Sequence, residues 1–383
     1  MRAVITAGGT AGHINPALAI ADEIIRNEPS SEIVFIGRKD GMERKLVNEA
    51  GYELREIDVH GLMRRVSPEN LVFNAKAVYK ALAAQKEVKR FLRGFGPDAV
   101  IGCGGYVSGP VVRAASDIGC VTVIHEQNAF PGMTTKLLAK RASLILCANE
   151  EGVDRIGYRN KTTVTGNPVR HAFFEASRQK LRDELGVGDR VFVLSFGGSN
   201  GAAGINRAAA MFISKHRHTD KVFHVHATGM HYRDSFPALL REFCIEDDCE
   251  NVRVCEYISD MPEHFAACDL IISRAGALTI SEIMASGKAS VLIPSPNVTD
   301  NHQFYNAMSL ANAGAAFVYE EKDIGDEGFV DKLMELADDT DYLKKMGENA
   351  GKLARPDAAP HIYRCVRNLL EGGKIHGIGE EPT

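Results

Sequence analysis

Two glycine-rich segments, far apart in the chain, are the first residues whose type and spacing could do chemistry. Residues 8–15 read GGTAGHIN and residues 197–206 read GGSNGAAGIN, and each follows a short apolar stretch typical of a β-strand. Glycines between a strand and a helix expose backbone N–H groups at the positive end of the helix dipole, which suits a phosphate or diphosphate. One such loop could equally be a tight turn that binds nothing, whereas two of them favour binding. Neither loop continues into Gly-Lys-Ser/Thr, so a P-loop ATPase is disfavoured.

Polar residues that could act on a substrate lie next to the same strands. His13 follows the first glycine loop, where a neutral imidazole could take a proton from an attacking hydroxyl or, alternatively, cap the helix or pair with a phosphate. His125 and Glu126 follow another predicted strand at the same edge. Glu282 comes about one turn into a predicted helix, where it could hold the hydroxyls of a ribose or only stabilise its helix. The other histidines are interpreted as surface or strand residues without a role, among them His216, His218, His224 and His226.

Two further patterns limit the class of enzyme. The second predicted strand ends in Arg38 and Lys39, without the carboxylate that would hold the ribose of NAD, although an arginine keeps an NADP oxidoreductase open. Asp-x-Asp occurs only as Asp339-Thr340-Asp341 in a polar stretch, which favours a solvated helix or loop over a metal site. We therefore expect no metal, and a departing nucleotide diphosphate would be stabilised by helix dipoles and a cation such as Arg170.

Short apolar stretches that alternate with longer amphipathic ones must position these residues. Continuous apolar strands separated by helix-length segments predict parallel sheets covered on both faces, an α/β class. The predicted strands are 4–6, 33–36, 99–101, 121–124, 162–164, 191–195, 222–225, 252–254, 270–272 and 290–293. Two similar strand–glycine–helix openings predict two Rossmann-like domains that face across a cleft, with ligands at the carboxyl ends of the strands. In the first, Asn15 as N-cap and Pro16 as first helical residue predict a helix over 17–26.

The length of 383 residues agrees with about two domains. We predict an N-terminal domain over 1–167, a C-terminal domain over 168–357, and a last helix and tail over 358–383. That helix could pack on the second domain or cross back to the first, and the chain from Gly372 is expected to be frayed. The eight cysteines form no C-x-x-C pair, which favours reduced, mostly buried thiols over zinc ligands.

The net charge of −5 is the sum of two halves of the chain that have opposite net charge. Residues 1–168 carry 22 Lys/Arg and 18 Asp/Glu, a net of +4, and the rest of the chain carries −9. The segment from Leu71 to Phe95, preceded by Arg64 and Arg65, interleaves basic and apolar residues. Such a segment can lie on an anionic membrane, where each cation contributes roughly 1 kcal/mol, although an ordinary helix with a basic solvated face is the alternative. Without a recognition motif, nucleic acid is disfavoured. No apolar run is long enough to span a membrane, and the N-terminus lacks a secretory signal.

Seven motifs occur in order between residue 4 and about residue 320. They are GGTAGH (8–13), GGYVSGP (104–110), HEQNAFPG (125–132), GNPVR (166–170), GGSNGA (197–202), RAGALTISE (274–282) and DNHQFYNA (300–307). With them the chain closely resembles the MurG family, the UDP-N-acetylglucosamine:undecaprenyl-diphospho-muramoyl-pentapeptide N-acetylglucosaminyltransferases of peptidoglycan synthesis, which have the GT-B fold. The resemblance implies a peripheral protein on the cytoplasmic face of the cell membrane, with a role in cell wall biogenesis, cell shape and cell division, and without a cofactor.

The resemblance also implies roles for particular residues. The C-terminal domain would hold the donor, with Ser199 and Arg170 at the diphosphate, the backbone of Ile258 at the uracil and Glu282 at the ribose. The further donor-binding positions carried over are Ala277, Leu278, Thr279, Ile280, Ser281 and Gln303, with Thr10, Ala11, Gly12 and Asn128 from the N-terminal domain. Gly9 and Tyr106 would lie on the acceptor side, with His13 as first choice for the catalytic base and Glu126 as second.

Three departures from the family pattern are small. Ala11 stands where many members have glycine, Asn200 where glutamine is frequent, and His302 where some have a second glutamine. None of them changes the reaction that the resemblance implies. In that reaction the C4 hydroxyl of the muramoyl sugar attacks the anomeric carbon of UDP-N-acetylglucosamine, with inversion and without a metal. A sugar-nucleotide epimerase of the same fold, or a nucleotide-sugar-binding protein without catalysis, remains as an alternative.

Overall fold

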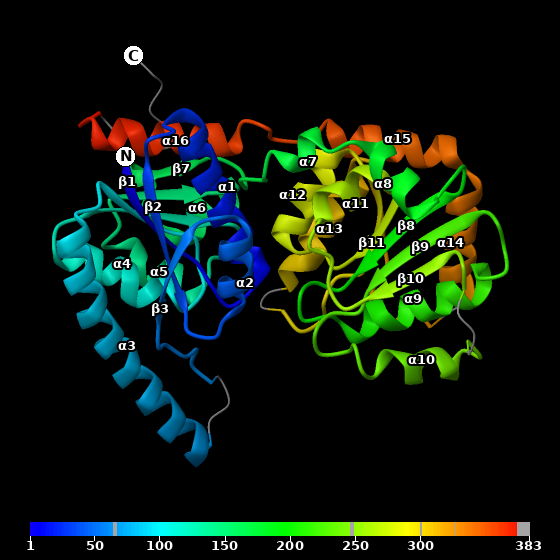
Figure 1. Ribbon diagram of the computed structural model, residues 1–383, viewed down its shortest axis with the longest axis horizontal. Coiled ribbons are helices and arrows are strands. Elements are labelled where there is room, and N and C mark those ends of the chain that lie inside the picture. The colour runs from blue at the N-terminus through cyan, green and yellow to red at the C-terminus, as the bar shows by residue number, and fades with distance from the viewer. Residues whose placement is uncertain (64–66, 246–248, 299–300, 326, 374–383) are drawn as a thin grey trace. The chain divides into compact units, whose positions relative to one another are not determined.

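The chain folds into two compact units. The structure, a computed structural model, describes residues 1–63, 67–245, 249–298, 301–325 and 327–373, so that Arg64, Arg65 and most of the expected frayed end lie outside the described residues. Unit 1 comprises Met1–Arg170 together with the chain from Asp357 onward, and unit 2 comprises His171–Pro356 (Figure 1). The division follows Arg170, shortly after the boundary expected at residue 167.

Unit 1 is built on a parallel sheet that the described residues form with seven strands in the order β3-β2-β1-β4-β5-β6-β7. The strands are β1 (Arg2–Thr6), β2 (Glu32–Arg38), β3 (Glu53–Ile57), β4 (Ala99–Gly102), β5 (Val121–Glu126), β6 (Leu144–Cys147) and β7 (Thr162–Val164). The central strands are apolar and buried on both faces, as parallel sheets require. Strand order reverses between β1 and β4, and in open α/β sheets ligands bind at such a switch point.

The helices of unit 1 follow its strands and cover the sheet. They are α1 (Ala11–Asn27), α2 (Met42–Glu49), α3 (Pro68–Phe95), α4 (Ser108–Asp117), α5 (Met133–Ala139), α6 (Glu150–Ile156), the short η1 (Arg159–Lys161) and α16 (Ala358–Leu370). Helix α3 has clear boundary signals, because Ser67 caps its N-terminus, Pro68 is its first residue and Gly96 ends it in the left-handed conformation. Its inner side packs with α4 on one face of the sheet, through Val88 and Leu92.

The start of helix α1 corrects one prediction. The helix begins at Ala11 with Thr10 as N-cap, and the N–H of His13 already donates to the carbonyl of Thr10 at 3.1 Å. The expected helix over 17–26 is therefore too short, and Pro16 lies inside the helix. Pro16 is the sixth residue of α1, beyond the first turn in which N–H groups lack a helical partner, so it gives the carbonyl of Gly12 no helical N–H donor. As a result, His13 belongs to the first turn of α1.

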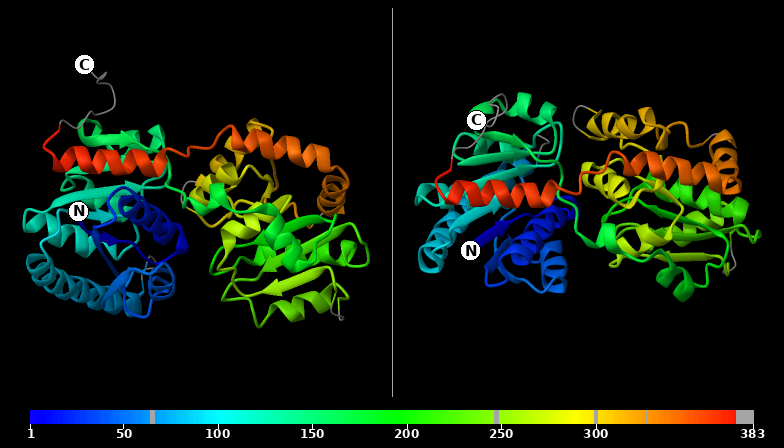
Figure 2. Two further views of the ribbon diagram at one scale, coloured as in Figure 1. Left: turned by 45° about the horizontal axis from the view of Figure 1, so that its top comes forward. Right: turned by 90° about the horizontal axis from the view of Figure 1, so that it is seen from above.

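Helix α16 returns to unit 1. It packs against α1 (Figures 1 and 2), and the hydroxyl of Tyr363 donates to Glu28 at 2.9 Å. Arg367 reaches the same carboxylate at 3.3 Å. Ile362 and Val366 are fully buried, so the apolar spacing read from the sequence is the packed side of the helix.

Unit 2 repeats the architecture with a parallel sheet of six strands among the described residues, in the order β10-β9-β8-β11-β12-β13. The strands are β8 (Val191–Phe196), β9 (Val222–Ala227), β10 (Val252–Cys255), β11 (Leu270–Ser273), β12 (Ala289–Leu292) and β13 (Ala316–Val318). The helices are α7 (Ala172–Glu175), α8 (Arg178–Leu185), α9 (Ala203–His216), α10 (Phe236–Glu242), α11 (Met261–Ala267), α12 (Ala277–Ser286), α13 (His302–Asn312), α14 (Glu327–Asp338) and α15 (Thr340–Gly351). The predicted α/β class with two parallel sheets is confirmed.

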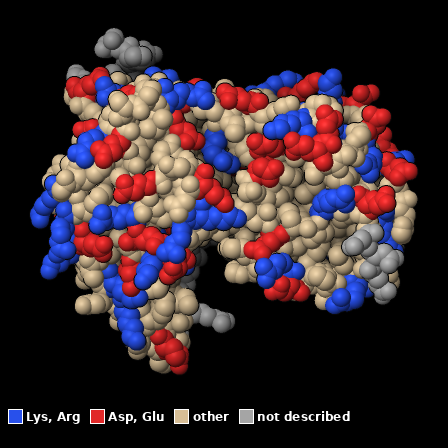
Figure 3. All heavy atoms as spheres, viewed as in Figure 1, with Lys and Arg blue, Asp and Glu red and all other residues tan. Residues whose placement is uncertain are grey.

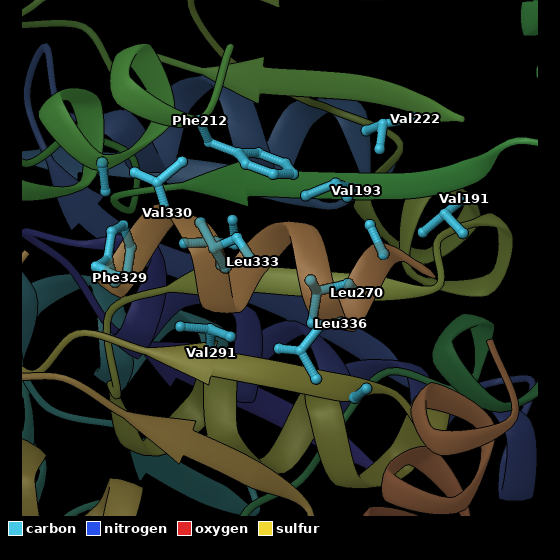
Figure 4. Packing of buried hydrophobic residues seen from close by; sticks show 14 of the residues in the cluster. Val191, Val193, Phe212, Val222, Leu270, Val291, Phe329, Val330, Leu333 and Leu336 are labelled. Atoms are coloured by element: carbon cyan, nitrogen blue, oxygen red, sulfur yellow. The ribbon is translucent and has the colours of Figure 1, made fainter. Parts of the chain in front are cut away.

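The core of unit 2 forms where α9 and α14 cover its sheet. Figure 4 shows Leu333 and Leu336 of α14 directed at Leu270 and Val291 of the central strands, with Phe212 of α9 nearby. These side chains are almost completely buried. Such a core holds strands β8 and β11 in place, and the carboxyl ends of those two strands carry the second glycine loop and the RAGALTISE motif.

Candidate active site

The first glycine loop packs tightly against the loop that follows β4. Gly9 has a φ of +88° and Gly105 a φ of +78°, and a Cβ on Gly105 would collide with the backbone of Gly8. The ring of Tyr106 lies against Gly9, and its hydroxyl accepts a hydrogen bond from Arg38 at 3.0 Å. Only glycine allows two backbone segments to approach this closely. The GGTAGH and GGYVSGP motifs therefore form one surface at the carboxyl edge of the sheet.

His13 is held by Gln127, a residue that the sequence interpretation did not single out. The amide nitrogen of Gln127 donates to the carbonyls of Cys103 (3.0 Å) and His125 (3.2 Å), so its oxygen must face His13. That oxygen lies 3.1 Å from Nδ1 of His13. Because an amide oxygen only accepts, Nδ1 carries the proton, and in the neutral imidazole the lone pair is on Nε2. A half-buried imidazole in this tautomer can accept a proton from a substrate hydroxyl.

Glu126 has a different environment. Its carboxylate is 3 % exposed and accepts hydrogen bonds from the N–H and the side chain of Asn128, from the N–H of Gly132 and from the hydroxyl of Thr135, the last at 2.5 Å. Both oxygens accept hydrogen bonds from the following loop and from α5, so the carboxylate stabilises the conformation of the HEQNAFPG segment. This geometry suits Glu126 to position the loop that follows β5.

His125 is buried and contacts the GNPVR segment. Its Nε2 lies 3.1 Å from the carbonyl of Gly166, and burial lowers the pKa of the imidazole to about 4. A neutral His125 therefore joins β5 to the GNPVR segment, in which Asn167 donates to the carbonyl of Gln127 at 3.2 Å. Arg170 ends this segment as the last residue of unit 1.

The second glycine loop in unit 2 is held by its neighbour loop after β9. The N–H groups of Met230 and His231 donate to the carbonyls of Ser199 (3.1 Å) and Asn200 (3.2 Å). Gly201 and Gly229 touch backbone to backbone, and a Cβ on either would collide with the other loop. The loop opens directly into the 14-residue helix α9. Its half-buried Ser199 is therefore presented at the positive end of a long helix dipole.

The RAGALTISE motif forms the turn from β11 into α12. Glu282 is 7 % exposed and lies in the second turn of α12, whose first residues are Ala277, Leu278 and Thr279. Arg274, which the sequence interpretation missed, donates to the carbonyls of Ile293 and Pro294 and pairs with Glu321 at 2.5 Å. An arginine directly after a buried strand is a signal that could have identified it.

The remaining candidates of unit 2 are placed around these two turns. Gln303 on α13 accepts a hydrogen bond from the N–H of Ser295 at 2.9 Å, and Ile258 is buried in the loop after β10. Within unit 1 the structure brings together Gly9, Thr10, Ala11, Gly12, His13, Tyr106, Glu126 and Asn128. Within unit 2 it brings Ser199, Ile258, Ala277, Leu278, Thr279, Ile280, Ser281, Glu282 and Gln303 to the carboxyl edge of the second sheet.

Two units, each a doubly wound parallel sheet with a glycine loop at its switch point, have the architecture of the GT-B fold. The N-terminal domain model of glycosyltransferase family 28 matches residues 3–147, and the C-terminal domain model matches residues 191–362. The chain belongs to the MurG family of glycosyltransferases.

Curated relatives carry that similarity over almost the whole chain. The UDP-N-acetylglucosamine--N-acetylmuramyl-(pentapeptide) pyrophosphoryl-undecaprenol N-acetylglucosamine transferase of Thermoanaerobacter sp. is 40% identical over 96% of this chain and 100% of its own. The protein of the same name from Acetivibrio thermocellus is 38% identical over 97% of this chain and 99% of its own.

Solved structures agree with the fold. MurG of Acinetobacter baumannii aligns with a TM-score of 0.67 at 28% identity, over 96% of this chain and 99% of that one. A UDP-GlcNAc 2-epimerase from Neisseria meningitidis bound to UDP-GlcNAc aligns with a TM-score of 0.64, but at 14% identity, over 97% and 100% of the two chains. The second likeness extends to the fold alone, and the GT-B prediction is confirmed.

Proposed function

We propose that this protein transfers N-acetylglucosamine from UDP-N-acetylglucosamine to the C4 hydroxyl of an undecaprenyl-diphospho-muramoyl-pentapeptide, the step that converts lipid I to lipid II in peptidoglycan synthesis. The observation that carries the proposal is the 40% identity over 96% of the chain to a transferase of that name. The two glycine loops support it, because each stands where a doubly wound unit binds its ligand.

The donor is assigned to unit 2. Ser199 and the first N–H groups of α9 take the diphosphate, the backbone of Ile258 takes the uracil, and Glu282 takes the ribose hydroxyls. The first turn of α12 and Gln303 orient the sugar, and Arg170 is assigned to the diphosphate. When UDP departs, its charge is stabilised by the dipole of α9 and by Arg170.

The acceptor is assigned to unit 1, with His13 as the catalytic base. Nε2 of His13 takes the proton of the C4 hydroxyl as its oxygen attacks the anomeric carbon from the face opposite UDP. The bond from the anomeric carbon to the diphosphate oxygen breaks, a β-1,4 bond forms, and UDP leaves with the electron pair. Tyr106 and Gly9 line the acceptor side, and Glu126 keeps the Asn128 loop in place.

A direct assay decides the function. Purified protein is mixed with labelled UDP-N-acetylglucosamine and a lipid-linked muramoyl-pentapeptide diphosphate, and label in the lipid fraction is measured. We expect transfer. Conversion of UDP-N-acetylglucosamine to its 2-epimer would favour the epimerase instead, and donor binding without any turnover would favour a binding protein.

Glu282 offers a prediction for the donor site. Glu282→Ala should raise the donor KM roughly 10- to 100-fold, because even one hydrogen bond from a hydroxyl to a carboxylate is worth about 1.5–3 kcal/mol. Steady-state kinetics at saturating acceptor measure the effect. The control is Glu242→Ala, because Glu242 is an exposed residue at the end of α10 and its loss should leave the donor KM unchanged. An unchanged donor KM in Glu282→Ala would refute the ribose role.

Helix α3 supports attachment to an anionic membrane surface, which would place the protein on the cytoplasmic face of the cell membrane. Leu71 and Tyr79 are 70% and 74% exposed, and Val72, Val78 and Leu82 are also exposed. Lys and Arg side chains gather along the same helix (Figure 3). Exposed apolar side chains among cations are typical of an interfacial helix. Among the described residues, no helix is long and apolar enough to span a bilayer.

The charges on α3 make the membrane proposal testable. Lys80 and Lys89 already pair with Asp58 and Asp117 at 2.8 Å, so they contribute less than the exposed cations. Neutralising the exposed set Lys76, Lys86, Arg90 and Arg93 to glutamine should weaken binding to anionic liposomes about 100-fold or more at low salt. Co-sedimentation measures binding, and the matched control neutralises Lys344, Lys345, Lys352 and Arg355 in unit 2. Equal binding of the two variants would contradict the proposal.

A further inference from the structure

Arg38, the last residue of β2, is a cation beside the acceptor side of unit 1 and has no assigned role. Its half-buried guanidinium donates from Nη1 to the hydroxyl of Tyr106 at 3.0 Å. The ring of Tyr106 in turn lies against Gly9 of the first glycine loop. Strands β1 and β2 run parallel and pair as far as Thr6 and Ile36, so Arg38 lies at the carboxyl edge of the sheet, where doubly wound units bind their ligands.

Arg38 and Tyr106 together hold hydrogen-bond donors that are not used within the protein. Of the five N–H groups of the guanidinium, one is donated to Tyr106 and one, at 3.4 Å, to the carbonyl of Asp40. The other three, and the O–H of Tyr106, meet no acceptor among the residues that the structure describes. Unused donors on a cation suit phosphate, and an arginine near the second strand of a doubly wound unit accommodates a phosphate in NADP enzymes.

The acidic groups near Arg38 have other partners. Asp40 pairs with Arg44 at 3.3 Å, and Oε1 of the buried Glu43 accepts the N–H of Gly9 at 3.1 Å. The hydrogen bond to Tyr106 is the main cause that raises the pKa of Arg38 above its ordinary value, so the guanidinium is charged at neutral pH. Because the N–H of Gly9 is already used, the first glycine loop has one donor fewer for a ligand, and an anion there depends more on Arg38.

We infer that Arg38 is a substrate-binding residue that contacts the diphosphate of the lipid-linked acceptor, with Tyr106 holding its guanidinium beside the first glycine loop. The residues assigned to the acceptor, Gly9, Tyr106 and His13, carry no permanent positive charge, whereas the donor diphosphate is assigned Arg170. A guanidinium can donate two parallel N–H groups to one phosphate, which favours an acceptor with a diphosphate link. The inference rests on the proposed function for its assignment of the acceptor to unit 1.

Two acceptors in detergent micelles test the inference without turnover. One carries the diphosphate link, and in the other a single phosphate joins the muramoyl-pentapeptide to the same prenyl chain. Each is titrated into the full chain by calorimetry with UDP present. Arg38→Gln should raise the Kd of the diphosphate-linked acceptor about tenfold or more, because a hydrogen-bonded charge pair is lost. The Kd of the monophosphate-linked acceptor should rise less than about threefold.

The matched control is Arg44→Gln, which makes the same change of charge at an exposed neighbouring arginine and should leave both Kd values unchanged. Arg38→Lys should restore part of the affinity for the diphosphate-linked acceptor, since it returns the charge without the paired N–H groups. In steady-state assays Arg38→Gln should raise the acceptor KM with kcat little changed, as loss of uniform binding predicts.

A double variant separates direct contact from support of Tyr106. In the Tyr106→Phe protein, Arg38→Gln should still weaken binding of the diphosphate-linked acceptor at least about fivefold. No further weakening there, equal losses for the two acceptors, or a fall in kcat at unchanged acceptor KM would overturn the inference, and so would a parent protein that binds neither acceptor. If the parent protein binds the acceptors but transfers no sugar, the proposed function fails while the titrations still decide the role of Arg38.

Discussion

Replacing His13 with alanine should lower kcat for sugar transfer by about 10² or more, because a positioned general base contributes roughly that factor. Gln127 holds the ring by its Nδ1 at 3.1 Å, so the lone pair of Nε2 is the group that is lost. The donor KM should change little, because the donor is assigned to unit 2. Stopped assays with labelled donor and saturating acceptor measure both constants.

Two comparisons separate catalysis by His13 from a structural effect. Added imidazole should restore part of the activity of His13→Ala, since it can enter the vacated space and accept the proton. Gln127→Leu keeps the imidazole but frees its tautomer, so kcat should fall less than in His13→Ala, and His218→Ala, at an exposed position, should leave it unchanged. Near-normal turnover of His13→Ala would return the role to Glu126 or to solvent.

The second large effect is a steep loss of unit 2 stability in acid. His216, His224 and His226 are fully buried and linked through Ser195: its hydroxyl lies 2.7 Å from both His224 and His226, and His224 lies 3.1 Å from His216. Burial lowers the pKa of His216 to about 4 and of His226 to about 3, and holds the pKa of His224 well below 6.5. Three imidazoles therefore stay neutral in the folded unit at neutral pH.

The sign of the effect follows from proton counts. Below about pH 6.5 the unfolded chain protonates all three imidazoles and the folded unit does not, so the unfolded state binds more protons and the free energy of unfolding falls as pH falls. Each histidine contributes about 1.4 kcal/mol per pH unit, and all three about 4 kcal/mol, until the pH approaches the folded pKa values. Above pH 6.5 this dependence should vanish.

Urea unfolding followed by circular dichroism at pH 7, 6 and 5 measures this slope, since the chain has no Trp for fluorescence. His226→Asn offers an amide in place of the ring Nδ1 and should remove about a third of the slope. His218→Ala, at an exposed position, is the control and should leave it unchanged. Equal stability at pH 7 and 5 would contradict the prediction.

The interpretation of His216 as a surface residue is wrong. His216 is the last residue of α9, and its side chain is completely buried.

The strands and the two glycine turns were predictable because they depend on short-range patterns. Continuous apolar runs identify β1, β8 and β11, and a buried parallel strand needs nothing else from its neighbours along the chain. The start of α1 was not predictable in the same way. Asn15 and Pro16 form a strong local signal for a helix start, but packing of Gly8 against Gly105 already orders the chain at Ala11.

The residues of the candidate site likewise fall into two groups, those that a local sequence pattern identifies and those that depend on distant partners. His13, Ser199 and Glu282 stand in motifs of the sequence, and their positions at strand ends follow from the α/β pattern. Gln127, Arg274 and Glu43 lie in or near such motifs, but their partners are 114, 47 and 34 residues away in the chain. A pattern along the sequence does not show which distant backbone group or ring a given side chain will contact.

By itself, the amino-acid sequence determined the two doubly wound sheets, the glycine loops, the basic helix α3 and the family, because these depend on residue type and spacing along the chain. Only the tertiary structure showed which group each of the imidazoles of His13 and His125 contacts, and that both oxygens of Glu126 accept hydrogen bonds. Tautomer, burial and charge compensation depend on atoms brought together by folding, and those atoms come from strands and helices far apart in sequence.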